Sequence, residues 1–555
     1  MKKKSGDLSY LLAIVLFSIL GMKALIAPGL FTAHDISHQV VRFFYYSQTV
    51  NGGQFPPYWI GRLANGFGYP LFFFSYHLPW IIGVALLKAG LDIPNALKTL
   101  LFLSYIGSGF TMYFFVKSLF KNRFSALLSS ILYLWLPYHF LIIFVGASLG
   151  IAFVYIFLPL LFLGIHLTRD GSKIGIPILA LGLSGLILSH IMHLIFLFPI
   201  IFIFLLWEFL NIKRRAVFFK NICFGLILGI LISSFYLIPA AYYNKSTRAH
   251  EEGGFYEVYK RNFINFNQLL YSKWGYGPII NNAKNGENSF QLGFAQWISI
   301  LILIMLIIFR KLAKNYQSLS IFLLSGFAIS VFLMLDHSKS LWAFLVKFAS
   351  VDFPFRLILP ASFIASICAA LVYLSVGKKM KFLFFLFLTF TALYSNRNHI
   401  NVNQYTNFPI KTYLDLETEI TTNTFNEYLP IEANSRLLNR PWNEIIADNT
   451  KATNVKQTAN SLSFDLNTQN EEIISVGQYY FPGQTLYLDN KQTKFGIDKE
   501  GRLSFLAPKG IYNVTVRYQE TTLIKISKAL TLIGILIITV VFLKEIKLFK
   551  KKSNF

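Results

Sequence analysis

Cysteine and acidic side chains are scarce in this 555-residue chain. The two cysteines, Cys223 and Cys368, both lie inside apolar runs, so the sequence excludes a disulfide framework and a cysteine metal site. We expect both to be small core residues. The 26 acidic residues are outnumbered by 51 lysines and arginines, which leaves a formal net charge of +25. The positions of those basic residues in the sequence therefore indicate whether they bind nucleic acid or mark the loops of a membrane protein.

The basic residues cluster at the ends of apolar segments, as in MKKK at the start, KRR at 213–215 and GKKMK at 377–381. Such clusters are typical of the cytoplasmic loops of membrane proteins, whereas nucleic-acid binding needs a basic stripe along one surface. We therefore expect no nucleic acid among the partners. Motifs of soluble enzymes are also missing: the sequence has no P-loop, no GxGxxG after a strand, no GxSxG and no HExxH.

Long hydrophobic runs, in contrast, are abundant. The chain is 54% hydrophobic, and its apolar runs repeatedly reach the length of a helix that crosses a bilayer. The first run follows MKKKSGD without a small-residue cleavage site, so we expect an uncleaved first span. We predict an α-helical polytopic membrane protein of about twelve spans, at residues 9–27, 98–116, 124–143, 150–168, 174–190, 193–210, 221–241, 293–309, 318–336, 357–376, 380–394 and 523–544.

The apolar run at 70–88 is different, because Pro70, His77 and Pro79 interrupt it and its length is marginal for crossing a bilayer. If it crossed, every later loop would invert and most basic clusters would fall outside. If it lies along the outer interface, nearly every basic cluster and both termini fall in the cytoplasm, as the positive-inside rule favours. We therefore predict twelve spans and one interfacial helix, with both termini cytoplasmic.

That topology leaves four sizeable outer pieces, at residues 28–97, 242–292, 337–356 and 395–521. In the last piece, stretches such as SLSFDLNTQ, TLYLDN and YNVTVRY alternate polar and apolar residues between turn-forming Gly, Asn, Asp and Pro. We predict a small β-rich outer domain at 430–520. The chain then divides into a transmembrane domain with the outer loop 28–97 (residues 1–394), an extracytoplasmic β-rich part (395–521), and a final helix with a basic tail (522–555).

The first outer loop carries the leading candidate site. Asp35, His38, Gln39 and Arg42 follow i, i+3, i+4, i+7 spacing, which predicts one polar face of an amphipathic helix whose apolar side lies in lipid. Asp35 is suited to act as general base on an acceptor hydroxyl, or to help bind a divalent cation. The alternative is a helix-start residue that favours the macrodipole. His38 shares the polar face and is the second catalytic candidate, and Arg42 is a candidate for substrate binding. His34 completes no zinc site with these side chains because a third ligand is not evident.

The same loop continues with a Gly/Pro turn followed by aromatic and polar side chains, among them Trp59, Arg62, Tyr69 and Tyr76. Sugars suit such a mixture, because their CH faces stack on rings while their hydroxyls take hydrogen bonds. Arg62 and Tyr69 are therefore candidates for substrate binding. An interfacial aromatic belt is the alternative explanation.

Later outer loops bring more ionisable groups to the same side of the membrane. His190 lies at the junction of two spans, Arg248 and Glu251 follow the seventh span, and Asp352 and Arg356 precede the tenth. An arginine at that depth pairs well with a phosphate or diphosphate headgroup, and snorkelling into lipid phosphates is the alternative. If the predicted site exists, Asp35, His190, Glu251 and Arg356 should line one outward-facing cavity.

Several short motifs together resemble one family. The order of Asp35, His38 and Arg42, the loop QFPPYWIGRLANGFGYPLFFFSY, and the later LPY, LSH, FYLIPA, SFQLGFAQ, DFPFR, EYLP and YYFPG are similar to bacterial membrane proteins labelled 6-pyruvoyl-tetrahydropterin synthase-related. The resemblance runs over most of the chain. The membrane part of that family resembles the GT-C glycosyltransferase superfamily, and no pterin enzyme is visible in the sequence.

The resemblance implies a bacterial cytoplasmic membrane protein with interfacial helices and an acid in its first outer loop, which by position is Asp35. It also implies sugar donors linked to a lipid phosphate. One departure stands out, because family members often carry Arg-Gly followed shortly by Glu after the LPY-type stretch, whereas residues 145–150 read VGASLG here. A second metal-ligating acid is therefore missing from that loop. Catalysis is then metal-independent, or Glu251, Glu252 or Asp352 substitutes, or activity has been lost.

The leading hypothesis is inverting glycosyl transfer on the outer face of the membrane, from a polyprenyl-phosphate sugar to a cell-envelope glycan, lipid or protein. Asp35 would deprotonate the acceptor, Arg356 with Arg62 or Arg248 would hold the leaving phosphate, and the β-rich domain would orient the acceptor. The alternatives are a non-catalytic carrier or flippase for a lipid-linked saccharide, and an inactive GT-C scaffold. Transporters place ionisable residues near the bilayer midplane, whereas most of these map to outer loops, which favours the enzyme.

Overall fold

The computed structural model of the chain describes residues 6–169, 173–250, 255–277, 283, 288–347, 351–417, 422–423, 426–439 and 452–553. Helices predominate. They are α1 (Leu8–Gly21), α2 (Ile36–Asn51), α3 (Leu71–Phe74), α4 (Leu78–Lys88), α5 (Ile93–Phe120), α6 (Arg123–Leu134), α7 (Pro137–Phe140), α8 (Leu149–Thr168), α9 (Gly175–His190), α10 (His193–Leu210), α11 (Arg215–Ile232), α12 (Ser234–Tyr243), α13 (Phe266–Leu270), α14 (Phe294–Ile308), α15 (Lys314–Met334), α16 (Lys339–Leu345), α17 (Ile358–Ser375), α18 (Lys381–Ser395), α19 (Ile410–Glu417) and α20 (Thr522–Ser553).

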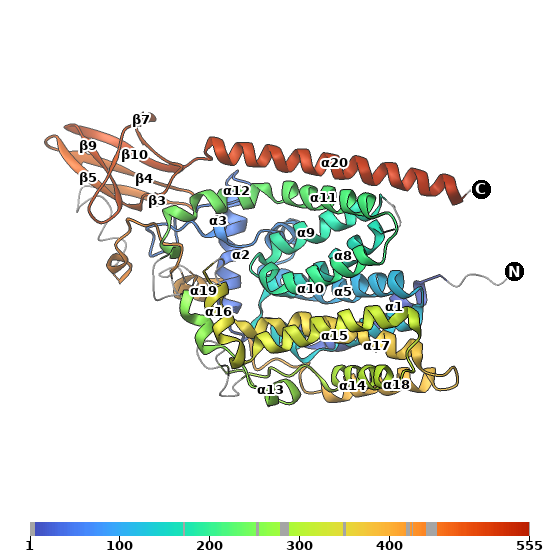
Figure 1. Cartoon of the computed structure of the whole chain (residues 1–555). Helices are drawn as coiled ribbons and strands as arrows, with labels where there is room; N and C mark the ends of the chain where they lie inside the picture. The colour runs from blue at the N-terminus through green and yellow to red at the C-terminus, as the bar shows by residue number, and fades with distance from the viewer. Residues whose placement is uncertain are drawn as a thin grey trace.

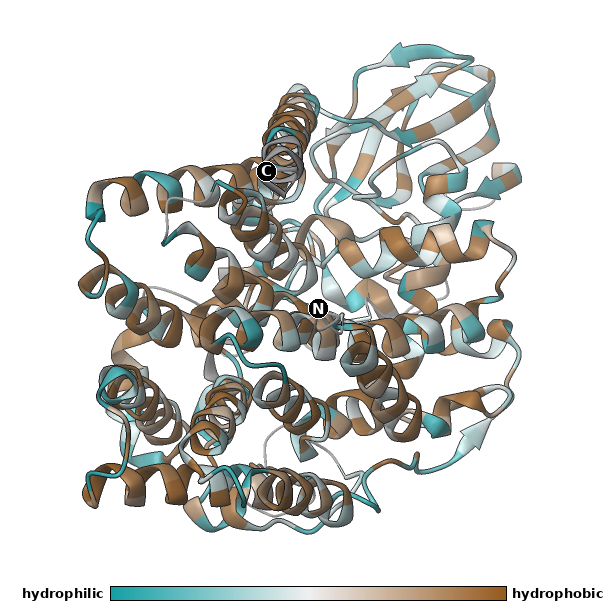
Figure 2. Cartoon of the chain, turned by 90° about the vertical axis from the view of Figure 1, so that its right-hand side faces the viewer, coloured by the Kyte–Doolittle hydropathy of each residue, from teal (hydrophilic) through white to brown (hydrophobic). Residues whose placement is uncertain are grey.

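The long helices run side by side in one bundle, and the strands gather at one of its two ends (Figure 1). The start of α1 and the end of α20 both lie at the opposite end. Apolar residues cover the helices of the bundle, whereas polar and apolar residues are mixed along the strands (Figure 2). The bundle is therefore suited to a lipid surrounding, and the end that carries the strands is suited to water.

Seven helices in the described part of the chain are long and apolar enough to cross a membrane, or up to eight if the bent pair Arg123–Leu134 and Pro137–Gly146 is one span. Five shorter apolar helices are Leu8–Gly21, Leu78–Lys88, Gly175–His190, Phe294–Ile308 and Lys381–Ser395. Four of these five lie at predicted spans, and Leu78–Lys88 lies in the segment predicted to be interfacial. A mostly helical, multi-pass protein is thus confirmed, and the count of twelve spans stays a prediction.

Proline breaks the third predicted span and shapes the loop after it. Pro137 begins α7, and Leu136 before it is extended with ψ 136°, as a residue that precedes proline prefers. A π-helical segment, Leu141–Gly146, follows and ends at Ala147, whose φ of 48° is left-handed. The chain therefore turns sharply before α8 and presents residues 145–148 to the end of the bundle.

Helix α2 crosses the end of the bundle at a steep angle to the long helices (Figure 1). Its apolar side is buried in protein: Val40 and Phe43 are fully enclosed, and the Phe43 ring stacks on Trp80 of α4 with 5.5 Å between ring centroids. Gly83 of α4 allows this approach, because a Cβ there would lie 2.7 Å from the Phe43 ring. The prediction that the apolar side of this helix lies in lipid was therefore wrong, since α4 and α5 cover it.

The strands form two antiparallel sheets after the described helix α19. The five-stranded sheet has the order β3-β4-β10-β6-β7, and the three-stranded sheet has the order β5-β9-β8. The strands are β3 (Ala452–Gln457), β4 (Ser461–Thr468), β5 (Glu472–Tyr479), β6 (Gln484–Leu488), β7 (Lys491–Thr493), β8 (Gly496–Ile497), β9 (Arg502–Ala507) and β10 (Gly510–Tyr518). The two sheets share one apolar core, in which Phe464 and Val514 of one sheet meet Val476 and Phe505 of the other. The small β-rich domain before the last helix is confirmed.

A short antiparallel pair ties the first outer loop to the segment after α18. Strand β1 (Leu30–Phe31) pairs with β2 (Tyr405–Thr406), with Leu30 opposite Thr406 and Phe31 opposite Tyr405. The Thr32 amide continues the pairing by donating to the Gln404 carbonyl. These backbone hydrogen bonds therefore hold the residues just before Asp35 and α2 in place.

Candidate functional site

One cavity of about 280 Å³ lies at the end of the bundle that carries the strands. Residues from the start of α2, the segment 74–76, the α9–α10 junction, α12, the segment 352–356 and the pairs 422–423 and 427–428 line it. They are Asp35, His38, Arg42, Phe74, Ser75, Tyr76, His190, Ile191, Met192, Tyr236, Asp352, Phe353, Arg356, Thr422, Asn423, Glu427 and Tyr428. Segments far apart in the sequence thus converge on the cavity, which we call the central cavity.

Asp35 stands directly before α2 and is held from two sides. Its backbone amide donates to the Gly146 carbonyl at 3.0 Å, and its carboxylate Oδ2 accepts a hydrogen bond from the Ser148 hydroxyl at 2.8 Å. Within the described residues its side chain makes no capping hydrogen bond to α2. The carboxylate is thus directed to the loop 146–148 and the central cavity, and not to the first turn of its own helix, so a purely capping role does not describe it.

Arg42 lies two turns further along α2, and its guanidinium is already engaged. Nε donates to the Thr422 hydroxyl at 3.0 Å, and Nη2 donates to the Asn423 side-chain oxygen at 2.7 Å. Arg42 was predicted to bind substrate. The structure gives it a second task, because it fixes the segment 422–423 in the wall of the central cavity.

Gln39 of the same predicted polar face is buried and makes two hydrogen bonds. Its side-chain amide donates to the Ala147 carbonyl at 3.3 Å, and its oxygen accepts from the Tyr76 hydroxyl at 2.8 Å. Burial raises the pKa of Tyr76 to about 12, with the Asp35 charge adding to the rise and the Arg42 charge opposing it. Tyr76 is therefore a neutral hydrogen-bonding group near neutral pH, and Gln39 joins α2 to the loop that carries Ser148.

The basic group of the central cavity is Arg356. It belongs to the 3-10 turn Pro354–Leu357 at the start of α17, and every residue of α17 from Ile358 to Tyr373 is buried, so the helix anchors the turn in the bundle. Its Nη1 lies 2.6 Å from Oδ2 of Asp352, and its guanidinium carbon lies 5.0 Å from the centre of the Phe353 ring. Burial raises the pKa of Asp352 and the Arg356 charge opposes that rise. The pair brings a nearly buried guanidinium to the cavity with one carboxylate beside it.

Two histidines meet at the junction of α9 and α10. The rings of His190 and His193 lie edge to face with 4.4 Å between their centroids. His190 lines the central cavity, whereas His193 is fully buried behind it. His190 is thus the member of the pair that can meet a ligand.

Three predicted site residues lie outside the central cavity. Arg62 lines a separate groove, where its guanidinium donates to the Gln457 carbonyl at 3.4 Å. Tyr69 is fully buried, and its hydroxyl accepts a hydrogen bond from the Tyr428 amide at 3.1 Å. Arg248 donates from its side chain to the Ala433 carbonyl and from its amide to the Leu429 carbonyl. Arg62 and Arg248 are therefore not beside Arg356, and Glu251 lies outside the described residues.

Ser148 was not predicted as a partner of Asp35, because nothing in its local pattern indicates a contact 113 positions earlier in the chain. Glu427 and Tyr428 were not predicted as cavity residues either, although they stand in the motif EYLP at 427–430. That motif was the available signal.

The donor set at Asp35 bears on the predicted divalent cation. In the part of the chain that the structure describes, no three His, Cys, Asp or Glu side chains form a group that could hold a metal ion. The described neighbour of the Asp35 carboxylate is a hydroxyl and not a second carboxylate. The described residues therefore do not fit a protein-bound cation at Asp35, and no catalytic step is assigned to one.

An apolar groove of about 430 Å³ lies beside the central cavity. Its lining residues are Leu194, Ile195, Phe196, Phe198, Pro199, Leu333, Trp342, Leu345, Val351 and Leu357. The two hollows adjoin along the chain, because Met192 and Arg356 line the cavity while Leu194 and Leu357 line the groove. A polar cavity thus adjoins an apolar groove on α10 and at the start of α17.

Fold and site together define a multi-pass helical membrane protein with a small β-rich domain and a polar cavity at the same end. No family model matches the chain, and no curated protein matches it. Among solved structures, the arabinofuranosyltransferase AftD from Mycobacteria is similar with a TM-score of 0.49 and 10% identity over 71% of this chain and 27% of that one. The archaeal oligosaccharyltransferase AglB from Archaeoglobus fulgidus, in complex with an inhibitory peptide and a dolichol-phosphate, follows at 0.40 and 12%, over 73% and 57%.

The chain thus spans about a quarter of the length of AftD and a little over half of AglB. The apo form of the Archaeoglobus fulgidus oligosaccharyltransferase gives a TM-score of 0.40 at 11% identity, over 77% of this chain and 57% of that one. At TM-scores below 0.5 these similarities establish neither a shared fold nor a shared activity. The chemistry that this chain can perform therefore follows from its own residues.

Proposed function

We propose that this protein is a membrane glycosyltransferase that moves a sugar from a polyprenyl-phosphate donor to a cell-envelope acceptor. The observation that carries the proposal is that Asp35 and Arg356 line one cavity at the end of the bundle where the strands gather. Glycosyl transfer from a lipid phosphate needs a base for the acceptor hydroxyl and a cation for the leaving phosphate. The cavity holds one candidate for each role.

Asp35 acts as the general base in this proposal. Its carboxylate takes the proton of an acceptor hydroxyl while that oxygen forms a bond to the anomeric carbon of the sugar. The bond from that carbon to the phosphate oxygen breaks at the same time, and the electron pair leaves with the phosphate, so the anomeric centre inverts. The Ser148 hydroxyl orients the carboxylate through its 2.8 Å hydrogen bond. His38, half-buried in the same wall, is the proposed second catalytic side chain.

Arg356 holds the departing phosphate. A guanidinium pairs with phosphate oxygens through two parallel hydrogen bonds, and its low exposure of 9% strengthens that interaction relative to water. Asp352 balances the guanidinium charge when no phosphate is present, because its carboxylate lies 2.6 Å away. Arg62 and Arg248 have no part in this step, since both lie outside the cavity that Arg356 lines.

The apolar groove beside the cavity suits the polyprenyl chain of the donor. Aliphatic and aromatic side chains line it, and Leu357 follows Arg356 directly in the sequence. A donor whose phosphate meets Arg356 therefore has an apolar surface next to it for the first isoprene units.

The proposed topology has twelve spans in the inner membrane of a bacterium. Both termini lie in the cytoplasm, and the β-rich domain lies outside.

A carrier or flippase for the same lipid is the second candidate, and an inactive scaffold is the third. The presence of Ser148 favours the hypothesis of an inactive scaffold, because members of the resembled family have a second acid in this loop, whereas this chain has a hydroxyl. The position of the ionisable residues at the bundle end supports the enzyme over the carrier.

The test uses purified protein with labelled polyprenyl-phosphate sugars and membrane extract, and it compares wild type with Asp35→Asn. We expect transfer by wild type and a loss of about 10²- to 10⁴-fold in the variant, the usual contribution of a general base. Undiminished transfer in Asp35→Asn removes Asp35 from catalysis. Saturable binding of the lipid-linked sugar without any transfer supports the carrier or the scaffold.

A further inference from the structure

We propose that a second, larger groove at the same end of the molecule binds the acceptor as an extended, uncharged glycan chain of several sugar units. The groove consists of two adjoining hollows of about 1140 Å³ and 380 Å³, which share Gly52 and Asn460. The residues that line the larger one are Phe44, Tyr45, Gln48, Asn51, Gly52, Arg62, Lys411, Leu414, Asp415, Gln457, Thr458, Ala459, Asn460 and Ser461. We call the two hollows together the outer groove. The inference rests on the proposed function, which requires an acceptor.

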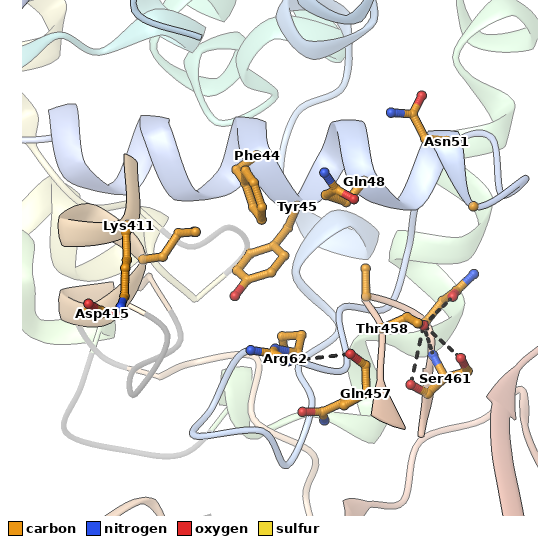
Figure 3. A pocket seen from close by; sticks show the side chains of 14 residues that line it. Phe44, Tyr45, Gln48, Asn51, Arg62, Lys411, Asp415, Gln457, Thr458 and Ser461 are labelled. Atoms are coloured by element: carbon orange, nitrogen blue, oxygen red, sulfur yellow. Dashed lines mark hydrogen bonds between the residues drawn. The ribbon is translucent and has the colours of Figure 1, made fainter. Parts of the chain in front are cut away.

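Four parts of the chain build the outer groove (Figure 3). Phe44, Tyr45, Gln48 and Asn51 lie along the second half of α2, and Lys411 and Asp415 face them from α19. Arg62, Gln457 and the turn between β3 and β4 close the remaining side. The groove thus lies between the helical bundle and the β-rich domain, and helix α2 is common to it and to the central cavity.

The chemistry of the lining suits a neutral sugar. Two aromatic rings stand next to amide and hydroxyl side chains, which both donate and accept hydrogen bonds as sugar hydroxyls require. The charged side chains of the outer groove are Arg62, Lys411 and Asp415 in the larger hollow and Glu520 and Lys528 in the smaller one. They are of mixed sign, so the groove offers no uniform field for an anion. The apolar side chains are too few for a lipid chain, in contrast to the apolar groove beside the central cavity.

The size of the outer groove favours several sugar units over one. The larger hollow alone exceeds the volume of about 300–1,000 Å³ that encloses a typical small ligand. From Phe44 to Gly52 the groove follows α2 for about 12 Å, at 1.5 Å per residue. A monosaccharide leaves most of this surface bare, whereas an extended glycan covers it.

The wall formed by the β-rich domain is preorganised. At the turn between β3 and β4, the Thr458 hydroxyl contacts the Ser461 hydroxyl at 2.7 Å and accepts from the Ser461 amide at 3.1 Å. The Gln457 amide donates to the carbonyls of Gly61 and Gly66, both at 2.8 Å, and so ties β3 to the loop after α2. Polar groups that are already fixed lose little entropy when a ligand binds.

Gln54 in the smaller hollow gives a separate indication of a missing partner. Its side chain is 9% exposed, and neither its oxygen nor its nitrogen makes a hydrogen bond to any group in the described part of the chain. A buried amide without a partner is unusual in proteins. Surrounding protein atoms cover both polar atoms, so a hydroxyl-rich ligand at this end of the groove supplies the missing donor and acceptor once the side chain turns outward.

A peptide is the other class of macromolecule that such a groove can take, because β3 is an edge strand and edge strands accept extended peptides. The groove wall favours the glycan, since amide and hydroxyl side chains beside the Phe44 and Tyr45 rings match the hydroxyls and CH faces of sugars. The two classes are separated by experiment.

The test measures binding to the purified full chain, without reference to transfer. One set of probes is neutral glycans, released by mild acid from the envelope of the cells in which the protein naturally occurs and fractionated by length. The other set is tryptic peptides of the envelope proteins of the same cells. The variant is Gln48→Ala with Asn51→Ala, because both side chains are exposed and line the groove. The matched control is Asn467→Ala with Gln492→Ala, two exposed polar side chains on β4 and β7 outside the groove.

We expect glycans to bind more tightly as their length increases, with affinity at least about tenfold weaker in the groove variant and unchanged in the control. Binding should also persist in Asp35→Asn, which separates the groove from the proposed chemistry. The proposal fails if no glycan fraction binds, if the groove variant binds as wild type does, or if peptides alone bind. Glycan binding without any transfer leaves the groove in place and removes only the proposed function.

Discussion

The hydroxyl of Ser148 donates a 2.8 Å hydrogen bond to the carboxylate of Asp35, 113 residues earlier in the chain. The contact is supported on both sides by backbone bonds, because the amides of His34 and Asp35 donate to the carbonyls of Val145 and Gly146. The end of the π-helical segment and the loop after it therefore together hold the start of α2 in place. It also means that a serine, and not an acid, stands next to the proposed base.

Removing this hydroxyl should slow transfer without unfolding the protein. We expect Ser148→Ala to lower kcat about tenfold, since a hydrogen bond to a charged group is worth about 1.5–3 kcal/mol and only part of it acts on orientation. Ser148→Thr keeps the hydroxyl and should restore most of the rate. The measurement is transfer of labelled sugar, with Ser463→Ala on β4 as the control. Equal rates for Ser148→Ala and wild type would show that the hydrogen bond has no catalytic role.

Substitutions of Arg356 and Asp352 should change donor binding without unfolding the protein. In Arg356→Lys the charge remains but the two-pronged contact with phosphate is lost, so the KM for the donor should rise by about tenfold or more. Asp352→Asn keeps the size of the side chain and removes the charge beside Arg356, so donor binding should persist or tighten. Donor titration at fixed acceptor measures both effects. A KM for Arg356→Lys equal to that of wild type contradicts the phosphate role.

Packing of α2 on α4 can be tested at Gly83. A methyl group there would lie 2.7 Å from the Phe43 ring, and that ring is itself stacked on Trp80. We expect Gly83→Ala to lower the free energy of unfolding by about 1–3 kcal/mol, the usual cost of overpacking. Thermal unfolding in detergent gives the change in midpoint. Gly377→Ala is the matched control, because nothing lies within 4 Å of a Cβ at that position; a similar loss in both variants would refute the packing argument.

Asp7 should make a pH-dependent contribution to stability at the end of the bundle opposite the strands. Its carboxylate accepts from Lys117, from Tyr113 at 3.0 Å and from Arg123 at 2.9 Å. These contacts, with that of Lys117 the largest, hold the pKa of Asp7 below its usual value of 3.8, although desolvation opposes them. The stabilisation is therefore present above pH 3.8 and is lost as the pH falls through the lowered pKa.

Asp7→Asn should consequently unfold more easily than wild type at pH 7, by about 1 kcal/mol for such a partly exposed network. The two proteins should approach each other in stability as the pH is lowered below 3.8. Thermal unfolding at pH 7, 5 and 3 makes the comparison. A difference that persists undiminished at pH 3 assigns the effect to packing and not to charge.

The predicted topology can be tested with single cysteines. After replacement of Cys223 and Cys368 by alanine, a cysteine at Asn467 in β4 should react with a membrane-impermeant thiol reagent in intact cells. A cysteine at Gly377, in the basic segment between α17 and α18, should react only after the membrane is opened. Reaction of both in intact cells, or the reverse pattern, contradicts the predicted orientation.

Sequence patterns predicted the elements well wherever one residue type dominated a long stretch. The apolar runs between basic clusters predicted helices such as α8 and α10 nearly to the residue, because a span has to satisfy all its backbone groups within itself. Period-two alternation likewise predicted the strands β4 and β10. The same approach misjudged α2, since an apolar helix face looks alike whether lipid or protein covers it.

For the site, the linear pattern was enough to predict which residue types were available: an acid in the first outer loop, an arginine before α17, a histidine at the end of α9. Packing of the chain in three dimensions settles which of them meet. It brought Asp35, His190 and Arg356 to one cavity, placed Arg62 in another groove and turned Arg42 to Thr422 and Asn423. The reason is physical: local pattern depends on neighbours within one or two turns, whereas a site depends on side-chain packing between segments hundreds of residues apart.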